Sequence, residues 1–382
     1  MSALDILHAA CDDPFAAARA ARERGQRVVA YLGTSVPVEL IRAGGAFALQ
    51  LAGDPAVAAP ASRVAASSAL AADASTQPPL SATYLDDEFD GEIRSLFDQI
   101  GGGACNVADL IVIPRASNGL LYLYYSLLEL RRLEPQRRFP DLLLYDVLNT
   151  PDWTTGQYVL DRTRALHAAL KGSLDSVQAA ITEANAVRRE LHALNARRRA
   201  GRLLGSTWWN ALRASRTLAP RDWLEAVRAL PDEDAPAKRL LLKGYGQDTP
   251  VLYLQAESLG ANVVADDHIG GERTAQALVD EDAEPLTALA GHYQRRVPTI
   301  RSWPQASEDA AWLALLEGSG AQGVLFYHEE FDDTFGWDHP QQTALLEARA
   351  VPHALLARQS YHAPDRGQQR AVLADLIERI AP

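Results

Sequence analysis

Cysteine is nearly absent from this sequence, which has only Cys11 and Cys105 among its 382 residues. The two lie 94 positions apart, a separation that matches no zinc-binding or redox motif. Free cysteine usually behaves as a small buried hydrophobic residue. We therefore expect two buried thiols in a cytoplasmic protein.

Basic charge is also in deficit, since 49 acidic side chains outnumber 37 basic ones and the net charge is −12. A field of this sign repels nucleic acid and anionic membranes, so we expect neither as a partner. No apolar stretch approaches the roughly 20 residues of a membrane span, and no apolar run behind a basic start predicts a secretory signal. With 47% hydrophobic residues, the chain has enough apolar material for two or three domains.

Two parts of the chain repeat one order of strand, glycine turn, proline-initiated helix, glycine stop and strand. Matching positions have similar separations: 213 for Pro37 and Pro250, 215 for Gly45 and Gly260, 214 for Leu110 and Val324, and 210 for Asp141 and Val351. Four separations this close are not expected by accident. The sequence therefore predicts an α/β fold, with two similar Rossmann-like parallel-sheet domains related by internal duplication, plus a helical segment.

The repeat also predicts where the domains begin and end. Apolar residues at helical spacing over 158–194 indicate a long helix or a helix pair, and a further helix over 221–230 precedes the linker PDEDAP. The expected division is an N-terminal helical segment 1–26, a first α/β domain 27–150, a helical segment and linker 151–235, and a second α/β domain 236–382.

The carboxyl ends of the predicted strands are the place to look for a site, because ligands of open parallel sheets bind there. Two such domains facing each other also form a crevice suited to a small molecule. The turns Gly33-Thr34-Ser35 and Gly244-Tyr245-Gly246 precede helix N-termini, which favour anions. Neither turn is a nucleotide-binding motif, and both also suit tight βα turns without a ligand.

A second pair of loops follows the next matching strands, at 115–119 (RASNG) and 328–339 (HEEFDDTFGWDH). The acidic loop offers oxygen and imidazole ligands for a hard metal ion. Its spacing matches no recognised metal motif, and a run of acids is usually a solvated face. We therefore predict no metal site.

Segment 28–51 (VVAYLGTSVPVELIRAGGAFALQL) resembles the opening of the 2-hydroxyacyl-CoA dehydratase D-component family, which includes the benzoyl-CoA reductase subunits. The likeness lies in the first strand, a Pro-x-Glu-Leu-Ile helix at Pro37, and an Ala-Gly-Ala turn that here reads Gly44-Gly45-Ala46. It continues through 108–119 (ADLIVIPRASNG), Asn185 and Arg188, 239–246 (RLLLKGYG), 258–273 (SLGANVVADDHIGGER) and 323–333 (GVLFYHEEFDD). The resemblance spans nearly the whole chain and implies two similar α/β domains plus helices.

Members of that family hold a [4Fe-4S] cluster between the domains through cysteines, and the cluster passes one electron at very low potential to a CoA thioester. Thiolates are required because they ligate iron strongly. The resemblance places Asp90, Ser117 and Asp332 at the three cysteine positions. It therefore implies a subunit with no cluster of its own, which pairs with a cluster-bearing paralogous subunit and acts on acyl-CoA.

The residues expected in the crevice follow from the loops and the resemblance together. The catalytic candidates are Asp90, Ser117, Asp332, Glu330 and His328. The candidates for binding the CoA thioester are Gly33, Thr34, Ser35, Arg115, Asn118, Gly244 and Gly246.

Two other functions stay open. In one, the chain is a stand-alone, non-redox acyl-CoA enzyme whose crevice carboxylates and His328 act as acid and base. In the other, it is a non-catalytic binding or assembly protein that kept the fold.

Structural roles for the same side chains also remain open. Asp90 suits a helix cap, Ser117 and Asn118 suit a turn, and Arg115 suits a bridge to surface acids. The tryptophans suit core or interface positions, and they are Trp208, Trp209 and Trp337.

Overall fold

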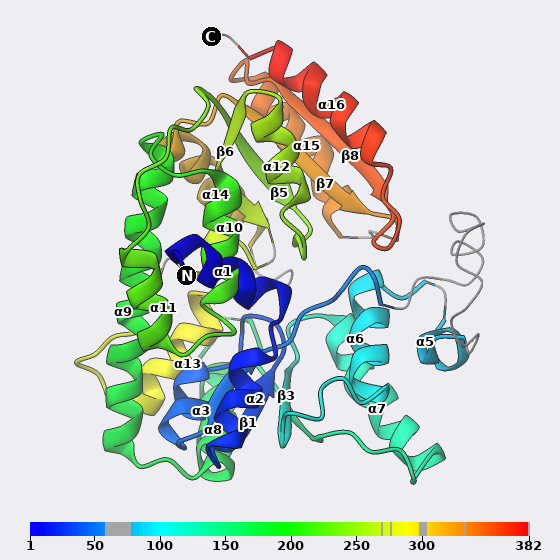
Figure 1. The fold of residues 1–382 in the computed structure, drawn as a ribbon, viewed down its shortest axis with the longest axis vertical. Helices are drawn as coiled ribbons and strands as arrows, with labels where there is room; N and C mark the ends of the chain where they lie inside the picture. The colour runs from blue at the N-terminus through cyan, green and yellow to red at the C-terminus, as the bar shows by residue number, and fades with distance from the viewer. Residues whose placement is uncertain are drawn as a thin grey trace.

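A computed structural model describes residues 1–57, 78–86, 88–150, 152–268, 270–275, 277–297, 304–331 and 334–380. Within these ranges the strands form two four-stranded, all-parallel sheets, ordered β2-β1-β3-β4 and β6-β5-β7-β8 (Figure 1). The strands are β1 (Val28–Tyr31), β2 (Phe47–Gln50), β3 (Leu110–Pro114), β4 (Asp141–Tyr145), β5 (Lys238–Gly244), β6 (Ala261–His268), β7 (Gly323–Glu329) and β8 (His353–Gln359).

The two sheets have the same strand order when β1 to β4 are matched with β5 to β8. The predicted pair of similar parallel-sheet domains is therefore confirmed. In each half the first strand is central, the second lies outside it, and the third and fourth continue on the other side. This shared order is what an internal duplication produces.

Helices precede, connect and follow the strands. In the first half they are α1 (Ala3–Asp12), α2 (Ala16–Glu23), α3 (Val38–Ala43), α5 (Leu80–Tyr84), α6 (Gly91–Gly101) and α7 (Asn118–Leu133). Between the sheets lie α8 (Trp153–Leu170), α9 (Leu174–Arg199), α10 (Gly205–Ala214) and α11 (Pro220–Arg228). The second half has α12 (Val251–Ser258), the 3-10 helix η1 (Glu272–Ala275), α13 (Pro285–Arg295), α14 (Gln305–Ser319), α15 (Phe335–Glu347) and α16 (Arg366–Glu378).

Both faces of the first sheet are covered, which explains why its strands read as continuous apolar runs. Alternate residues of β1 enter two different cores, with Val29 and Tyr31 on one face and Val28 and Ala30 on the other. The second sheet is built in the same way. Of the tryptophans, Trp208 and Trp209 are buried as expected, whereas Trp337 is 83% exposed and is not a core residue.

The helical stretch 158–194 is a helix pair and not one long helix. The chain leaves α8 at Lys171, which has a left-handed φ of 64°, and Ser173 caps α9 by accepting a hydrogen bond from the Ser176 amide. The second helix of the pair, α9, then runs along one side of the molecule beside both sheets (Figure 1).

Two buried arginines of α9 connect it to both halves. Arg188 lies 2.7 Å from the Glu39 carboxylate on α3, and Tyr293 donates a 2.8 Å hydrogen bond to the same carboxylate. Ten residues later, Arg198 lies 2.9 Å from Asp266 on β6, with both side chains fully buried. Each ion pair is removed from water, so loss of either arginine leaves a buried carboxylate without its counter-charge.

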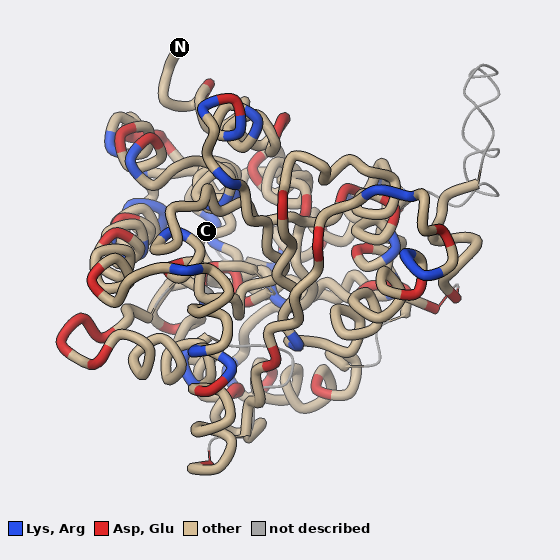
Figure 2. The backbone as a smooth tube through the Cα atoms, turned by 90° about the horizontal axis from the view of Figure 1, so that it is seen from below, with Lys and Arg blue, Asp and Glu red and all other residues tan. Residues whose placement is uncertain are grey.

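Acidic and basic residues are interspersed over the helices (Figure 2). The net charge of −12 is therefore spread over the surface. Among the described residues, every helix is too short or too polar to cross a bilayer.

The bridge from Arg188 to Glu39 predicts a large effect of one substitution. Arg188→Met should lower the free energy of unfolding by about 3–5 kcal/mol, because Glu39 stays buried without its counter-charge. Urea denaturation measures the loss. The neighbouring Arg189 is a matched control, since its side chain is 53% exposed and pairs with Glu281 at the surface. Arg189→Met should cost about 1 kcal/mol or less. Equal losses in the two variants would contradict the assignment.

Candidate functional site

The two halves touch where the carboxyl ends of their strands meet. Tyr361 follows β8, and a Cβ added to Gly91 at the start of α6 would lie 2.2 Å from the Tyr361 Cβ. A Cβ on Gly53, just after β2, would lie 2.0 Å from the Tyr361 hydroxyl. His362 Nδ1 is 2.9 Å from the Pro55 carbonyl oxygen. Loops far apart in the sequence are therefore in direct contact, and only glycine fits at two of the contact points.

Three carboxylates from the two halves gather at this contact, and we refer to Asp90, Glu92 and Asp248 as the carboxylate cluster. The Tyr361 hydroxyl donates a 2.6 Å hydrogen bond to Asp248, and Arg213 approaches the other Asp248 oxygen at 3.4 Å. A Cβ on Gly53 would lie 2.9 Å from Asp248 Oδ2 and 3.0 Å from Glu92 Cγ, so both acids border that glycine.

The cluster contains a group that holds its proton near neutral pH. Burial raises the pKa of Glu92 to about 8, and the negative charges of Asp248 and Asp90 add to the effect. Burial and Asp248 likewise raise the pKa of Tyr361. A carboxyl with a pKa near the working pH is suited to general acid and base catalysis.

Asp90 and Ser117, two of the residues expected at the family's cysteine positions, lie close together. Asp90 Oδ2 is 3.2 Å from the position of a Cβ on Gly119, two residues after Ser117. The Ser117 hydroxyl accepts a 3.1 Å hydrogen bond from the Leu120 amide and so caps α7. Asp90 occupies the equivalent position before α6, but its side chain makes no capping hydrogen bond. The third residue, Asp332, lies outside the described residues.

The remaining catalytic candidates follow β7. His328 is buried, and its ring stacks on Phe335 of α15 with centroids 6.2 Å apart and meets His339 at 5.4 Å. Its neighbour Glu329 points to the other face, since successive strand residues alternate, and it helps to raise the pKa of Tyr361. Glu330 is half-buried just beyond the strand. The structure thus brings Glu329 toward the carboxylate cluster and places His328 under α15.

The predicted binding residues are spread over several loops. Gly33 and Thr34 line a cavity at the end of β1. The next residue in the sequence, Ser35, is buried. Arg115 lies 3.5 Å from Asp146, and Asn118 is exposed at the start of α7. Gly244 ends β5, and the half-buried Gly246 lies in a turn held by a 2.8 Å hydrogen bond from Trp209 Nε1 to the Gln247 carbonyl.

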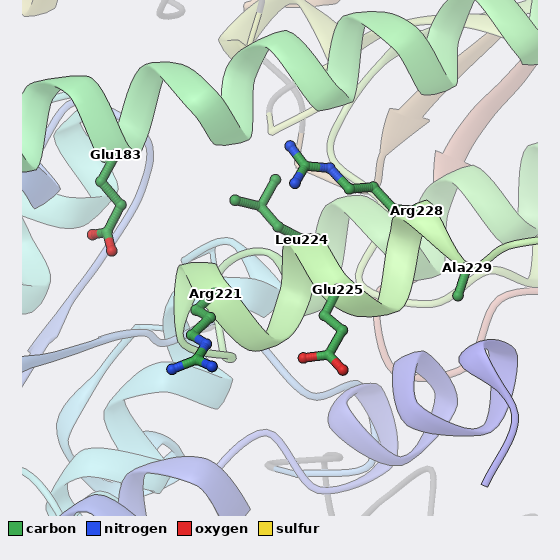
Figure 3. A pocket seen from close by; sticks show the side chains of 6 residues that line it. All are labelled: Glu183, Arg221, Leu224, Glu225, Arg228 and Ala229. Atoms are coloured by element: carbon green, nitrogen blue, oxygen red, sulfur yellow. The ribbon is translucent and has the colours of Figure 1, made fainter.

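A larger groove lies elsewhere, between α9 and α11, with a volume of about 620 Å³. Its lining consists of Glu183, Arg221, Leu224, Glu225, Arg228 and Ala229. Figure 3 shows that these side chains come from two helices and that their charged groups do not converge. No strand of either sheet contributes to it, so it is not our candidate site.

Sequence reasoning missed Glu92, Asp248, Tyr361 and Arg213. Two of them had a usable signal, since Glu92 is two residues after Asp90 and Asp248 is two residues after Gly246. Nothing in the sequence singles out Tyr361 or Arg213, because their role arises only from the contact between the halves.

Comparison with known proteins identifies the family. Residues 34–380 match the family model of the 2-hydroxyglutaryl-CoA dehydratase D-component. The chain belongs to this family. It is also similar to the beta subunit of (R)-phenyllactyl-CoA dehydratase from Clostridium sporogenes, with 23% identity over 136 residues. That match covers 36% of this chain and 36% of the relative. The resemblance to the D-component family inferred from the sequence is confirmed.

The described cysteines of this D-component chain do not fit the iron–sulfur cluster that the sequence analysis associates with other members of the family. Cys105 is fully buried ahead of β3, at the opposite end from the crevice, and Cys11 on α1 directs its thiol to the Asn210 carbonyl at 3.6 Å. Burial raises the pKa of both thiols to about 12, so both are protonated, whereas iron–sulfur ligation needs thiolates. In the described ranges, no three His, Cys, Asp or Glu side chains are grouped to hold a metal ion.

The raised pKa of Glu92 predicts a pH-dependent stability. The folded protein keeps the Glu92 proton up to about pH 8, whereas the unfolded chain loses it near its ordinary value of 4.5. The folded state binds more protons in this window, so stability falls as pH rises from about 4.5 to about 8. Glu92→Gln should flatten this decline and melt at a higher temperature than the parent above pH 8. Thermal melts across this range measure it, with the exposed Glu347→Gln as control. Parallel profiles for parent and Glu92→Gln would refute the assignment.

Proposed function

We propose that this chain is a subunit of a 2-hydroxyacyl-CoA dehydratase-type complex, that it binds a CoA thioester, and that it has no iron–sulfur cluster of its own. One observation supports this above all. A chain that matches the D-component family over residues 34–380 has Asp90 and Ser117 where the resemblance expects thiolates, and Asp90 Oδ2 lies 3.2 Å from the position of a Cβ on Gly119, two residues after Ser117.

A chain without thiolates needs another source of electrons for reductive thioester chemistry. The proposed source is a paralogous, cluster-bearing subunit in a heterodimer. The similarity to a protein described as a beta subunit supports an assembly of several chains. The related benzoyl-CoA reductase chemistry, an oxidoreductase reaction in place of a lyase reaction, would use the same arrangement.

The carboxylate cluster suits the proton transfers of a dehydration. Loss of a 2-hydroxyl group as water requires a proton for the departing oxygen. Glu92 holds a proton at neutral pH because its carboxyl is buried beside Asp248 and Asp90. We propose that it donates this proton, while the hydrogen bond from Tyr361 keeps Asp248 in place.

Iron–sulfur reconstitution tests the absence of a cluster. The purified chain, incubated anaerobically with iron and sulfide, should retain no stoichiometric cluster after desalting, as measured by iron content and visible absorbance. The triple variant Asp90→Cys, Ser117→Cys, Asp332→Cys is the matched comparison and should retain iron, because it restores thiolates at the three positions. A stable cluster with one-to-one stoichiometry in the parent chain would refute the proposal, and a paralogous partner bearing the cysteines should co-purify with it.

A second function is favoured by the proton held on Glu92. The chain would then be a stand-alone acyl-CoA enzyme that uses the carboxylate cluster for acid–base chemistry without redox steps. If so, the isolated chain turns over an acyl-CoA thioester, and Glu92→Gln lowers kcat by about 10²–10⁴-fold, the usual contribution of a general acid. The pH–rate profile of the parent should show an ionisation near 8 that the variant lacks. Absence of turnover by the isolated chain leaves the subunit function as the better explanation.

A further inference from the structure

A small cationic cavity lies beside the carboxylate cluster, at the carboxyl ends of β1 and β2. Its volume is about 110 Å³, and α9 and the end of α10 close it on the side away from the sheet. The polar groups of its lining include the guanidinium groups of Arg42, Arg188 and Arg216, the phenols of Tyr31 and Tyr293, the hydroxyls of Thr34 and Ser215, and the amide of Gln50. We refer to it as the arginine cavity.

The charges around the arginine cavity do not balance. Its described lining contains three arginines and no carboxylate. The Glu39 carboxylate neutralises Arg188 from behind at 2.7 Å. Within the described part of the chain, the Arg42 guanidinium has no hydrogen-bond acceptor. Arg216 donates to the Gly270 carbonyl, and the Asp266 and Asp248 carboxylates, which lie outside the lining, partly balance its charge. The acids that act on Arg188 and Arg216 thus lie outside the cavity, and the lining itself contributes only positive charge.

Arg42 and Arg216 both lie close enough to Tyr31 to influence the pKa of its phenol. Burial raises the pKa of the Tyr31 phenol, and the charges of Arg42 and Arg216 oppose that rise. Burial also lowers the pKa of Arg216 to about 10, which leaves it protonated at neutral pH. Both guanidinium groups are thus charged, near Tyr31 and part of the lining of the same cavity.

We propose that the arginine cavity binds an oxyanion, a carboxylate or phosphate group of the substrate, with Arg42 and Arg216 as its main ligands. Planar guanidinium groups match the geometry of both anions. The cavity is far smaller than the roughly 300–1,000 Å³ of sites that enclose a whole small molecule, so it holds one group of a larger ligand. Anion binding by the cavity is independent of the proposed function. The assignment of the anion to a CoA thioester rests on that function.

The position of the cavity relative to the carboxylate cluster narrows the choice of anion. Gln50 lines the cavity, and Gly53, three residues later, borders Glu92 and Asp248. Three residues span at most about 10 Å. A carboxylate at the far end of a short acyl chain fits this distance when the thioester lies at the cluster. A phosphate of the CoA moiety fits only if the pantetheine arm folds back.

Binding of simple anions tests the cavity itself. We expect calorimetric titration of the full-length chain at constant ionic strength to show binding of inorganic phosphate or glutarate. Arg42→Ala should weaken binding about 10-fold or more, because a charge-assisted hydrogen bond is lost. Arg42→Lys keeps the charge and should retain part of the affinity, and it also serves if the alanine variant does not fold. Arg164→Ala is the control, since Arg164 is an exposed residue of α8 that pairs with Asp161 at the surface.

Paired CoA ligands then identify the source of the anion. A preference for glutaryl-CoA over butyryl-CoA that Arg42→Ala abolishes assigns the cavity to an acyl carboxylate. A preference for CoA over 3′-dephospho-CoA that the variant abolishes assigns it to a phosphate, and either result supports the proposal. Failure of both simple anions to bind overturns it, as does equal affinity in parent and folded Arg42→Ala. Arg42-dependent binding of simple anions by a chain that binds no CoA thioester supports the cavity but refutes the proposed function.

Discussion

The arrangement of this protein depends on two buried arginine–carboxylate pairs on one helix. Arg188 and Arg198 of α9 are ten residues apart, about 15 Å along the helix axis. One binds Glu39 after the first strand of the first sheet, and the other binds Asp266 on the second sheet. Loss of either arginine would leave a buried carboxylate without its counter-charge. The two pairs therefore hold α9 in a defined position against each sheet. That constraint sets the orientation in which the carboxyl ends of the two sheets face each other.

The facing strand ends bring groups of opposite charge into neighbouring places. Asp90, Glu92 and Asp248 form an acidic cluster at the contact between the halves, while Arg42, Arg188 and Arg216 surround a small cavity a few residues away. Neighbouring carboxylates raise one another's pKa, and a cavity lined by arginines attracts anions. A substrate with a reacting group and a distant anion would satisfy both places at once. This arrangement is the basis for the proton transfer and the anion binding that we propose for this member of the D-component family.

The candidate site was only partly visible in the sequence. Asp90 and Ser117 do lie together, because they precede the helices α6 and α7, whose first turns are adjacent. His328 was expected in the crevice, yet strand alternation turns its ring toward Phe335 and directs Glu329 to the other face. Glu92 and Tyr361 were not expected at all. Glu92 is an ordinary acid in the sequence, and burial against a residue of the other half is what raises its pKa.

The sequence by itself determined the secondary structure, the duplicated parallel sheets and the family, since these depend on local apolar periodicity, glycine and proline turns, and a repeat of near-constant length. Only the tertiary structure decided which loops meet. Gly53, Gly91 and Tyr361 are far apart along the chain, and their contact depends on how α9 joins the two sheets. The protonation of Glu92 and the charge around the arginine cavity follow from that contact. Electrostatic energies depend on distance and burial in space, which no spacing along the chain specifies.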